Sequence, residues 1–382
     1  MASERVVRPQ GFWTGNRFER GLEAAFVDGK LVELRPTVHK PDPVWISPPF
    51  ANVHSHLEYR GLQSKIQSSN YWEWIRELTE KKASQDLDQV KADCILAAQE
   101  NKATGVGLIG EHSDRPFSGA ALAGVGIRGK IFQEVITFLE SGSPAEKLAL
   151  IKKKMEGQRA EVLAAGGGLR LMLAPHALYT VDEATLASFQ PGAPSIHLAE
   201  SPVENEYFES GTGPIAELYA KFQVQRNLSN RSAVREAVDI GVVGSGTQCV
   251  HCCAVSDDDI ELLAQVGAVI AHCPRSNIAL GCPPAPIEEM LAAGLKIGIG
   301  MDSPASSGEI DFFAEMRAVT GVSAEKIWEV GTTMGAATLG FSDWGVHDPE
   351  TAADQPYIKI QSPALTVQEL IEFGNPAQVE WL

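Results

Sequence analysis

Residues 44–56 have the sequence VWISPPFANVHSH, in which a long apolar run leads into two histidines separated by one serine. A continuous apolar run such as Val44–Val53 is typical of a strand that is buried on both faces of a parallel sheet. Seven further runs of this kind follow, so the sequence predicts eight strands. They span Val106–Glu111, Gly129–Ile136, Leu169–His176, Ser195–Glu200, Thr247–Cys252, Ala268–Cys273 and Lys296–Asp302.

Helical patterns separate the apolar runs. Asp86–Thr104 opens on an aspartate and keeps apolar residues at a spacing near 3.6, and Ser256–Gly267 opens on an acid-rich turn. Residues 145–165 and 286–294 show similar patterns. Strands that alternate with helices in this way predict an α/β fold, and eight such units favour a (β/α)₈ TIM barrel over an open sheet.

Both ends of the chain depart from this alternation. Glu23–Leu34 is typical of a hairpin with an Asp-Gly turn, and Tyr357–Ile360 of a short strand. Neither fits a βα unit. We therefore expect a small β appendage formed by residues 1–47 and 346–382, with the barrel spanning residues 48–345.

Composition excludes several classes of function. The 382 residues include 32 Lys and Arg against 49 Asp and Glu, which gives a net charge of −17. Such a charge repels nucleic acid and anionic lipid, so neither is expected as a partner. No apolar run approaches the roughly 18 residues of a membrane span, and the first residues resemble no signal peptide. We expect a cytoplasmic protein.

The cysteines are too few for a disulfide framework, since there are six in the whole chain. Cys249-x-x-Cys252 has half of a zinc-ligand spacing, but Cys253, Cys273 and Cys282 supply no matching second half. Small thiols in a buried core are therefore the preferred interpretation.

Histidines concentrate at the ends of the predicted strands. In a (β/α)₈ barrel the carboxyl ends of the strands build the active site. Asp302 ends the eighth strand and Glu200 the fifth in the same way. Six of the nine histidines lie at such ends, namely His54, His56, His176, His197, His251 and His272.

His54 and His56 form the sharpest local signal. Residues two apart on a strand point to the same side, so both imidazoles would converge, although H-x-H pairs also occur by chance. With His197 and Asp302 they make a candidate site of three imidazoles and one carboxylate, which suits one Zn²⁺ or Fe²⁺. The fourth predicted strand has no lysine to bridge a second ion. No organic cofactor is expected.

Two more residues are candidates for moving protons. Glu200 lies three residues after His197, where a carboxylate could carry a proton between water and substrate. The alternative is an acidic residue that merely opens the next helix. His251 could contact the same water, or could be structural.

At these residues the chain resembles the amidohydrolase superfamily, in its adenine-type deaminase and chlorohydrolase branch. The motifs NVHSHLE, APHALYTV, IHLAES and VHCCAVSDDDI, together with residues 271–306, carry the resemblance over nearly the whole chain. Met301 and Ala177-Leu178 are small departures. The resemblance implies a metal held by His54, His56, His197 and Asp302, catalysis by Glu200, His251 and Asp302, and a substrate that faces His176.

The implied reaction is hydrolytic deamination of a small adenine-bearing nucleoside-like molecule. YWEWIRELTEKK and GIRGKIFQEVITF resemble bacterial aminodeoxyfutalosine deaminases of the menaquinone pathway. S-adenosylhomocysteine, methylthioadenosine and adenosine are alternative substrates. Guanine, cytosine or halotriazine hydrolysis by the same machinery also stays open, as does a scaffold without activity. A homodimer is one assembly open to the chain.

A benzoate-bearing substrate such as aminodeoxyfutalosine requires a cation. Arg60 and Arg76 follow the first strand, and an arginine can hold a carboxylate with two parallel hydrogen bonds. Trp72 and Trp74 lie nearby and could stack on an aromatic ring. Glu58, directly after the histidine pair, is a further candidate contact. Both arginines could instead be solvated residues on a helix surface.

Overall fold

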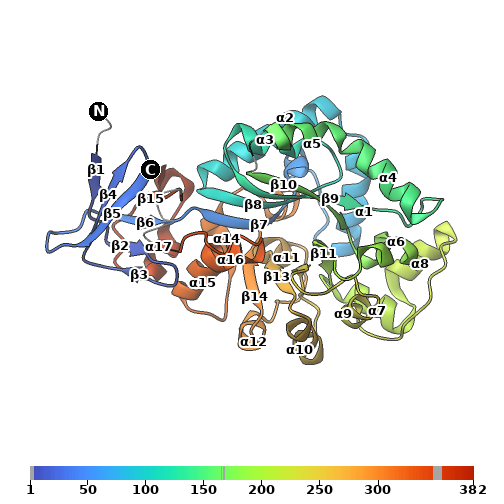
Figure 1. The fold of residues 1–382 in the computed structure, drawn as a ribbon. Coiled ribbons are helices and arrows are strands. Elements are labelled where there is room, and N and C mark those ends of the chain that lie inside the picture. Colours follow the sequence, from blue (N-terminus) through green and yellow to red (C-terminus); the bar gives the residue numbers. More distant parts are fainter. Residues whose placement is uncertain (1–3, 165, 167, 347–354) are drawn as a thin grey trace.

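The centre of the molecule is formed by eight parallel strands in two four-stranded sheets (Figure 1). The computed structural model describes residues 4–164, 166, 168–346 and 355–382. The first sheet contains β7 (Phe50–Ser55), β8 (Val106–Ser113), β9 (Arg128–Val135) and β10 (Leu169–Pro175). The second contains β11 (Ser195–Leu198), β12 (Gln248–His251), β13 (Val269–His272) and β14 (Lys296–Ile299).

The two sheets meet at two seams, and each seam carries a single isolated parallel bridge. Ser55 pairs with Asp302 at one seam, and Ala177 pairs with His197 at the other. The arrangement is TIM-barrel-like, but the described residues do not form the continuous ladder of a closed barrel. Proline contributes to this at the second seam, because β10 ends on Pro175, which has no N–H to donate.

Helices surround the strands, and two of the predicted helices illustrate how the sequence determines where a helix begins. The Asp86 side chain accepts a hydrogen bond from the Gln89 N–H at the start of α2, and Ser256 forms a capping box with Asp259 at the start of α10. Residues 145–165, predicted as one helix, form two. No helix in the described ranges is long and apolar enough to cross a membrane. The helices are α1 (Tyr71–Ala83), α2 (Leu87–Ala103), α3 (Ser118–Gly124), α4 (Pro144–Lys154), α5 (Glu156–Ala164), α6 (Glu183–Leu186), α7 (Pro202–Ser210), α8 (Gly213–Phe222), α9 (Ala233–Asp239), α10 (Asp257–Val266), α11 (Pro274–Ala279), α12 (Ile287–Ala292), α13 (Pro304–Ser307), α14 (Phe312–Ala318), α15 (Ala324–Gly331), α16 (Thr333–Thr338) and α17 (Val367–Phe373).

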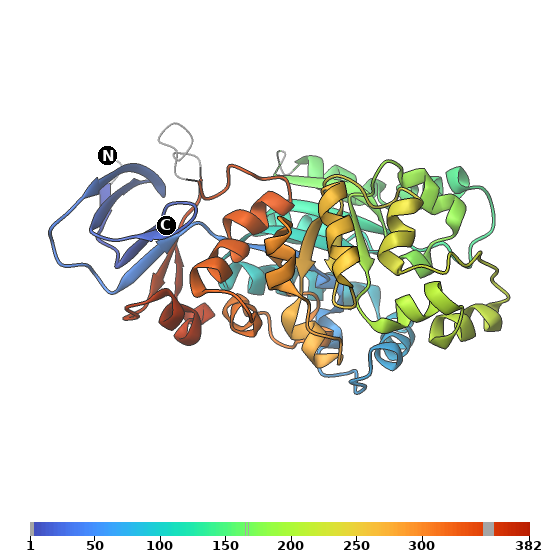
Figure 2. The ribbon, with the colours of Figure 1, turned by 90° about the horizontal axis from the view of Figure 1, so that it is seen from below.

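The two ends of the chain form a separate β layer beside the central strands (Figure 2). The predicted hairpin is confirmed, and its turn residues Asp28 and Gly29 have φ angles of 50° and 78°. It belongs to a three-stranded sheet of β1 (Glu4–Val7), β4 (Leu22–Val27) and β5 (Lys30–Pro36). A five-stranded sheet joins both termini in the order β16 (Val379–Trp381), β15 (Ile358–Gln361), β6 (Val44–Ser47), β2 (Gly11–Trp13) and β3 (Phe18–Glu19).

The prediction of one strand over Val44–Val53 is wrong. The run contains two strands, because Pro48 and Pro49 interrupt it and neither can donate to a ladder. The first, β6, lies in the terminal sheet, and the second, β7, begins the central sheet. The proposed boundary after residue 47 falls on this link, and residues 347–354 of the proposed C-terminal part lie outside the described residues.

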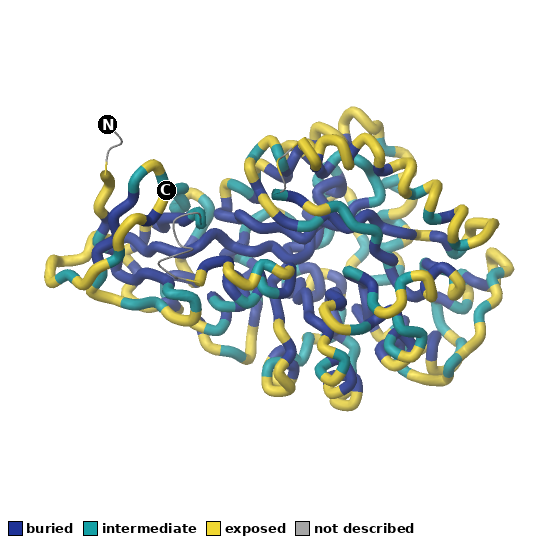
Figure 3. Tube along the Cα trace, viewed as in Figure 1, coloured by how far each residue is buried: buried dark blue, intermediate teal, exposed yellow. Residues whose placement is uncertain are grey.

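An aromatic cluster joins the terminal sheet to the central strands. Phe50, the first residue of β7, stacks on Phe312 with ring centroids 4.7 Å apart and meets Trp328 at 5.4 Å. Phe18 contacts Trp45 at 4.8 Å and Trp328 at 5.1 Å. Because Phe50 begins its strand, this cluster covers the amino end of β7. Figure 3 shows the central strands buried and the outer helix faces exposed.

Candidate active site

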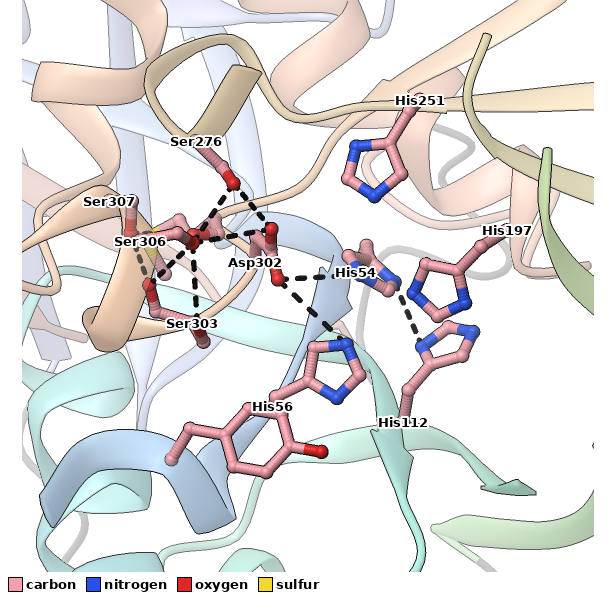
Figure 4. Close-up of polar contacts among 12 residues, drawn as sticks. His54, His56, His112, His197, His251, Ser276, Asp302, Ser303, Ser306 and Ser307 are labelled. Carbon is pink, nitrogen blue, oxygen red and sulfur yellow. Dashed lines mark hydrogen bonds and ion pairs between the residues drawn. The ribbon is translucent and has the colours of Figure 1, made fainter. Parts of the chain in front are cut away.

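The opposite, carboxyl ends of the central strands hold a cluster of imidazoles and carboxylates (Figure 4). His54 lies in β7, His197 in β11 and His251 in β12, while Asp302 follows β14. Overlapping groups of three ligand atoms lie within 4.8 Å of one another. Three of these groups consist entirely of residues that the sequence predicts as candidates. They are His54, His197 and His251; His54, His56 and Asp302; and Glu200, His251 and Asp302.

The Asp302 carboxylate is held in one orientation by two serines. Ser276 Oγ donates to Oδ2 at 2.5 Å, and Ser306 Oγ donates to the same oxygen at 3.3 Å. The other oxygen, Oδ1, lies 3.6 Å from His54 Nε2 and 3.8 Å from His56 Nε2. The serines therefore leave one carboxylate oxygen facing two imidazole nitrogens.

Three of the imidazoles, those of His54, His197 and His251, are oriented by hydrogen bonds at their Nδ1 atoms. His197 Nδ1 donates to the backbone oxygen of His176 at 2.9 Å, so its Nε2 carries a lone pair. His54 Nδ1 lies 3.0 Å from His112 Nδ1. His251 Nδ1 accepts from Asn277 Nδ2 at 3.0 Å, which leaves the proton on its Nε2.

These atoms fit a divalent cation. His54 Nε2 is buried and has no hydrogen-bond partner within the described part of the chain. Tetrahedral Zn²⁺ with bonds near 2.0–2.1 Å places its ligand atoms about 3.3 Å apart, close to the spacing of Asp302 Oδ1 from the two imidazoles. Burial also lowers the pKa of His54 and of His56 well below the usual range. The neutral imidazole that results is the form that binds metal.

Glu200 lies beside this donor set. Its Oε2 is 3.4 Å from His251 Nε2. Burial raises the pKa of Glu200 well above its usual range; the Asp302 carboxylate adds to the rise and a hydrogen bond with Tyr71 opposes it. A carboxyl with a raised pKa can hold a proton near neutral pH and release it.

The backbone around the site adopts unusual conformations. Ala199, His251, Cys252 and Asp302 have φ angles of 49°, 74°, 48° and 52°. Such angles cost of order 1–3 kcal/mol each in non-glycine residues and tend to cluster at functional sites. The turn at Ala199 is supported by Glu204, whose Oε2 accepts the Ala199 N–H at 2.6 Å. The strained turns aim Glu200, His251 and Asp302 toward one another.

The chain is similar to known proteins over most of its length. The sequence matches the amidohydrolase family over residues 45–371. The chain belongs to the amidohydrolase family. It is therefore a hydrolase that acts on C–N bonds.

Relatives of this amidohydrolase include named deaminases. A 5-methylthioadenosine/S-adenosylhomocysteine deaminase of Haloarcula marismortui is 30% identical over 345 residues, which cover 84% of this chain and 74% of the relative. The Helicobacter pylori aminofutalosine deaminase in complex with methylthio-coformycin matches with a TM-score of 0.82 and 18% identity, over 98% of this chain and all of that one. An adenosine deaminase from Xanthomonas campestris with bound zinc matches with a TM-score of 0.78 and 20% identity, over 98% and 90% of the two chains. The two structural matches show the shared fold.

The predicted substrate contacts of the amidohydrolase lie at different distances from the cluster. His176 is half-buried beside it, with its ring centroid 4.8 Å from that of His197. Trp72 is half-buried with its ring centroid 6.0 Å from that of Tyr179, and Trp74 is buried. His176 thus lies beside the cluster, whereas Trp72 lies against Tyr179.

Two of the charged candidates that follow β7, Arg60 and Glu58, are engaged with other residues. Arg60 donates from Nε and Nη2 to the two carboxylate oxygens of Glu100, at 2.9 and 2.6 Å. Because the Arg60 guanidinium already pairs with Glu100, its binding of a substrate carboxylate is not favoured. Arg76 is exposed on α1. Glu58 is buried, accepts from Ser113 Oγ at 2.6 Å, and has its pKa raised to about 7, mainly by burial.

Two residues that the sequence reasoning missed also face the cluster. Glu134, in β9, is buried, and its carboxylate oxygens have no hydrogen-bond partner in the described ranges. Its Oε1 lies 3.9 Å from His197 Nδ1. His112, in β8, contacts His54. The available signals were a carboxylate inside the apolar run Gly129–Ile136 and a histidine directly after Val106–Glu111.

The six cysteines join none of the ligand groups found among the described residues. All six are free, and Cys249, Cys252, Cys253 and Cys273 are buried. Their interpretation as core thiols is confirmed, whereas Cys282, which was interpreted in the same way, is only half-buried. His272 ends β13 as predicted, but it joins none of the ligand groups found in the described residues.

Proposed function

We propose that this amidohydrolase removes the amino group of an adenine-bearing nucleoside by hydrolysis. One divalent cation, Zn²⁺ or Fe²⁺, would be held by His54, His56, His197 and Asp302. The observation that carries the proposal is the approach of Glu200 Oε2 to His251 Nε2, at 3.4 Å, directly beside this donor set. It provides a proton carrier and a hydrogen-bond donor where an activated water and a ring would meet.

A divalent cation in such a site supplies Lewis-acid activation of water near neutral pH. Glu200 donates its proton to a ring nitrogen and so makes the adjacent carbon electrophilic. His251 keeps its proton on Nε2, because Asn277 engages Nδ1, and this N–H can donate a hydrogen bond to the attacking oxygen. The Asp302 carboxylate accepts one proton from the water and passes it to the amino group, which leaves as ammonia, while the remaining hydroxyl proton returns to Glu200 as the ring carbonyl forms.

Glu134 and His176 support a nucleoside over a free base. They lie on the carboxyl ends of the neighbouring strands β9 and β10, and the His176 N–H donates to the Val135 backbone oxygen at 3.1 Å. A buried carboxylate without partners is unfavourable unless a ligand supplies hydrogen-bond donors. Sugar hydroxyls would do so, whereas guanine, cytosine or a halotriazine has no sugar.

The finer substrate belongs to the same proposal. The names of the relatives favour methylthioadenosine and S-adenosylhomocysteine, and adenosine and aminodeoxyfutalosine carry the same base. For aminodeoxyfutalosine, Arg76 is the better of the two predicted benzoate contacts, because Arg60 is paired with Glu100.

Ammonia release from a small panel tests the proposal. Metal-loaded protein is assayed with adenosine, 2′,3′-dideoxyadenosine and guanine. We expect adenosine to exceed the dideoxy compound by at least about tenfold in kcat/KM, since a hydrogen bond to a charged group contributes about 1.5–3 kcal/mol. Glu134→Gln should narrow that ratio, and Glu209→Gln, an exposed change, should leave it unchanged. Activity on guanine without activity on adenosine would overturn the proposal.

A further inference from the structure

His112 lies directly behind His54 and is the hydrogen-bond partner of its Nδ1. The two Nδ1 atoms are 3.0 Å apart, and the ring centroids are 4.3 Å apart. Both side chains are buried, at 0% and 2% exposure. Two ring nitrogens at this distance share one hydrogen, so one must donate and the other must accept.

The direction of that hydrogen bond follows from residues on the far side of His112. Gln248 Nε2 donates to the Val53 backbone oxygen at 3.1 Å, which turns its amide oxygen toward Ser195. Ser195 Oγ lies 3.0 Å from Gln248 Oε1 and 3.2 Å from the Gln248 backbone oxygen. Both of these atoms can only accept, so the Ser195 hydroxyl donates to Gln248.

The Ser195 oxygen is then left as an acceptor for His112. His112 Nε2 lies 2.8 Å from it and donates. His112 Nδ1 consequently carries a lone pair and accepts from His54 Nδ1–H. His54 Nε2 is left with its lone pair, and that atom is the one 3.6 Å from Asp302 Oδ1. Hydrogen bonds thus run in one direction from His54 through His112 and Ser195 to Gln248.

We infer that His112 and Ser195 are positioning residues that fix the tautomer and ring plane of the metal ligand His54. The inference rests on the proposed metal site. His197 obtains the same help from a backbone oxygen, which substitution cannot remove. For His54 the acceptor is a side chain from another strand, so its contribution can be measured. Removing the partner of a metal-bound imidazole typically weakens metal binding about 10- to 100-fold.

Zinc affinity of the folded variants, measured by competition with a chromophoric chelator, tests this inference. His112→Leu should raise the zinc dissociation constant about 10- to 100-fold. His112→Asn, whose Oδ1 can still accept from His54, should stay much closer to the wild type. Ser195→Ala should weaken binding less than His112→Leu, because His112 can still accept. His39→Leu, at an exposed histidine, is the matched control.

The absorption spectrum of the Co²⁺-loaded protein is a second readout, because it reports ligand geometry independently of turnover. We expect its visible bands to shift in His112→Leu and to be unchanged in His39→Leu. Wild-type zinc affinity and an unchanged spectrum in His112→Leu would overturn the inference. If that variant does not fold, wild-type affinity in Ser195→Ala together with strong weakening in His112→Asn would overturn it. A wild-type protein that binds no stoichiometric metal would instead overturn the proposed function.

Discussion

Glu200 stands where three features of the site meet: the His251 imidazole, the Asp302 carboxylate and the strained turn at Ala199. The position of Glu200 could be predicted from its spacing after His197, because the carboxyl ends of barrel strands converge. The side chains that orient the site could not be predicted in this way. Asn277 and Ser276 lie on α11, and only folding brings them against His251 and Asp302.

Replacement of Glu200 by glutamine should leave the metal bound and abolish most of the rate. The amide has the same shape but cannot carry a proton, and positioned acid–base catalysis is worth about 10²–10⁴-fold in rate. The measurement is kcat with adenosine, alongside metal content, with Glu209→Gln on the exposed side of α7 as control. A rate within tenfold of the wild type would assign proton transfer to another residue.

At the scale of elements, seven of the eight central strands could be predicted because buried parallel strands are continuously apolar, whereas the first apolar run joined β6 and β7 into one predicted strand. The seams between the two sheets could not be predicted, since side chains there add hydrogen bonds to a short backbone pairing. Asn52 is the clearest case. Its Oδ1 accepts the Met301 N–H at 2.9 Å across the seam between β7 and β14, and its Nδ2 donates to Asn101 Oδ1 at 3.0 Å.

Asn52→Ala should lower the free energy of unfolding by about 1–3 kcal/mol, because it leaves the buried Met301 N–H and Asn101 Oδ1 without partners. Denaturant unfolding of the metal-free protein measures this loss separately from metal binding. Asn16→Ala, at an exposed position, is the control. A change below about 0.5 kcal/mol, the usual scatter of surface substitutions, would mean that the seam does not depend on Asn52.

At the scale of the whole molecule, the sequence predicted that both termini build one β layer, and the mixed sheet of β16, β15, β6, β2 and β3 confirms the pairing of the two ends. The aromatic contacts that hold this layer were not predictable, because ring packing depends on residues far apart in sequence. The burial of acidic side chains was not predictable either, because it also depends on residues far apart in sequence. Glu315, in α14, is buried against Arg275, and burial raises its pKa to about 8.

This raised pKa predicts a pH-dependent stability. Between about pH 4.5 and pH 8 the folded protein keeps a proton on Glu315 that the unfolded chain releases, so stability should fall as pH rises through this range. Glu315→Gln should flatten the dependence, while Glu372→Gln, at an exposed position, should not. The free energy of unfolding measured at about pH 5, 6, 7 and 8 tests this. An unchanged slope in Glu315→Gln would contradict the assignment.

Removal of metal followed by stepwise return tests the proposed chemistry most directly. Protein stripped with a chelator, and shown by elemental analysis to be metal-free, is titrated with Zn²⁺ or Fe²⁺ while ammonia release is followed. The substrates are adenosine, methylthioadenosine, S-adenosylhomocysteine and aminodeoxyfutalosine. We predict no activity without metal, and recovery on at least one of these substrates that reaches its plateau at one equivalent. Full activity in the metal-free protein, a plateau at two equivalents, or no ammonia from any of the four would contradict a single-metal deaminase of adenine nucleosides.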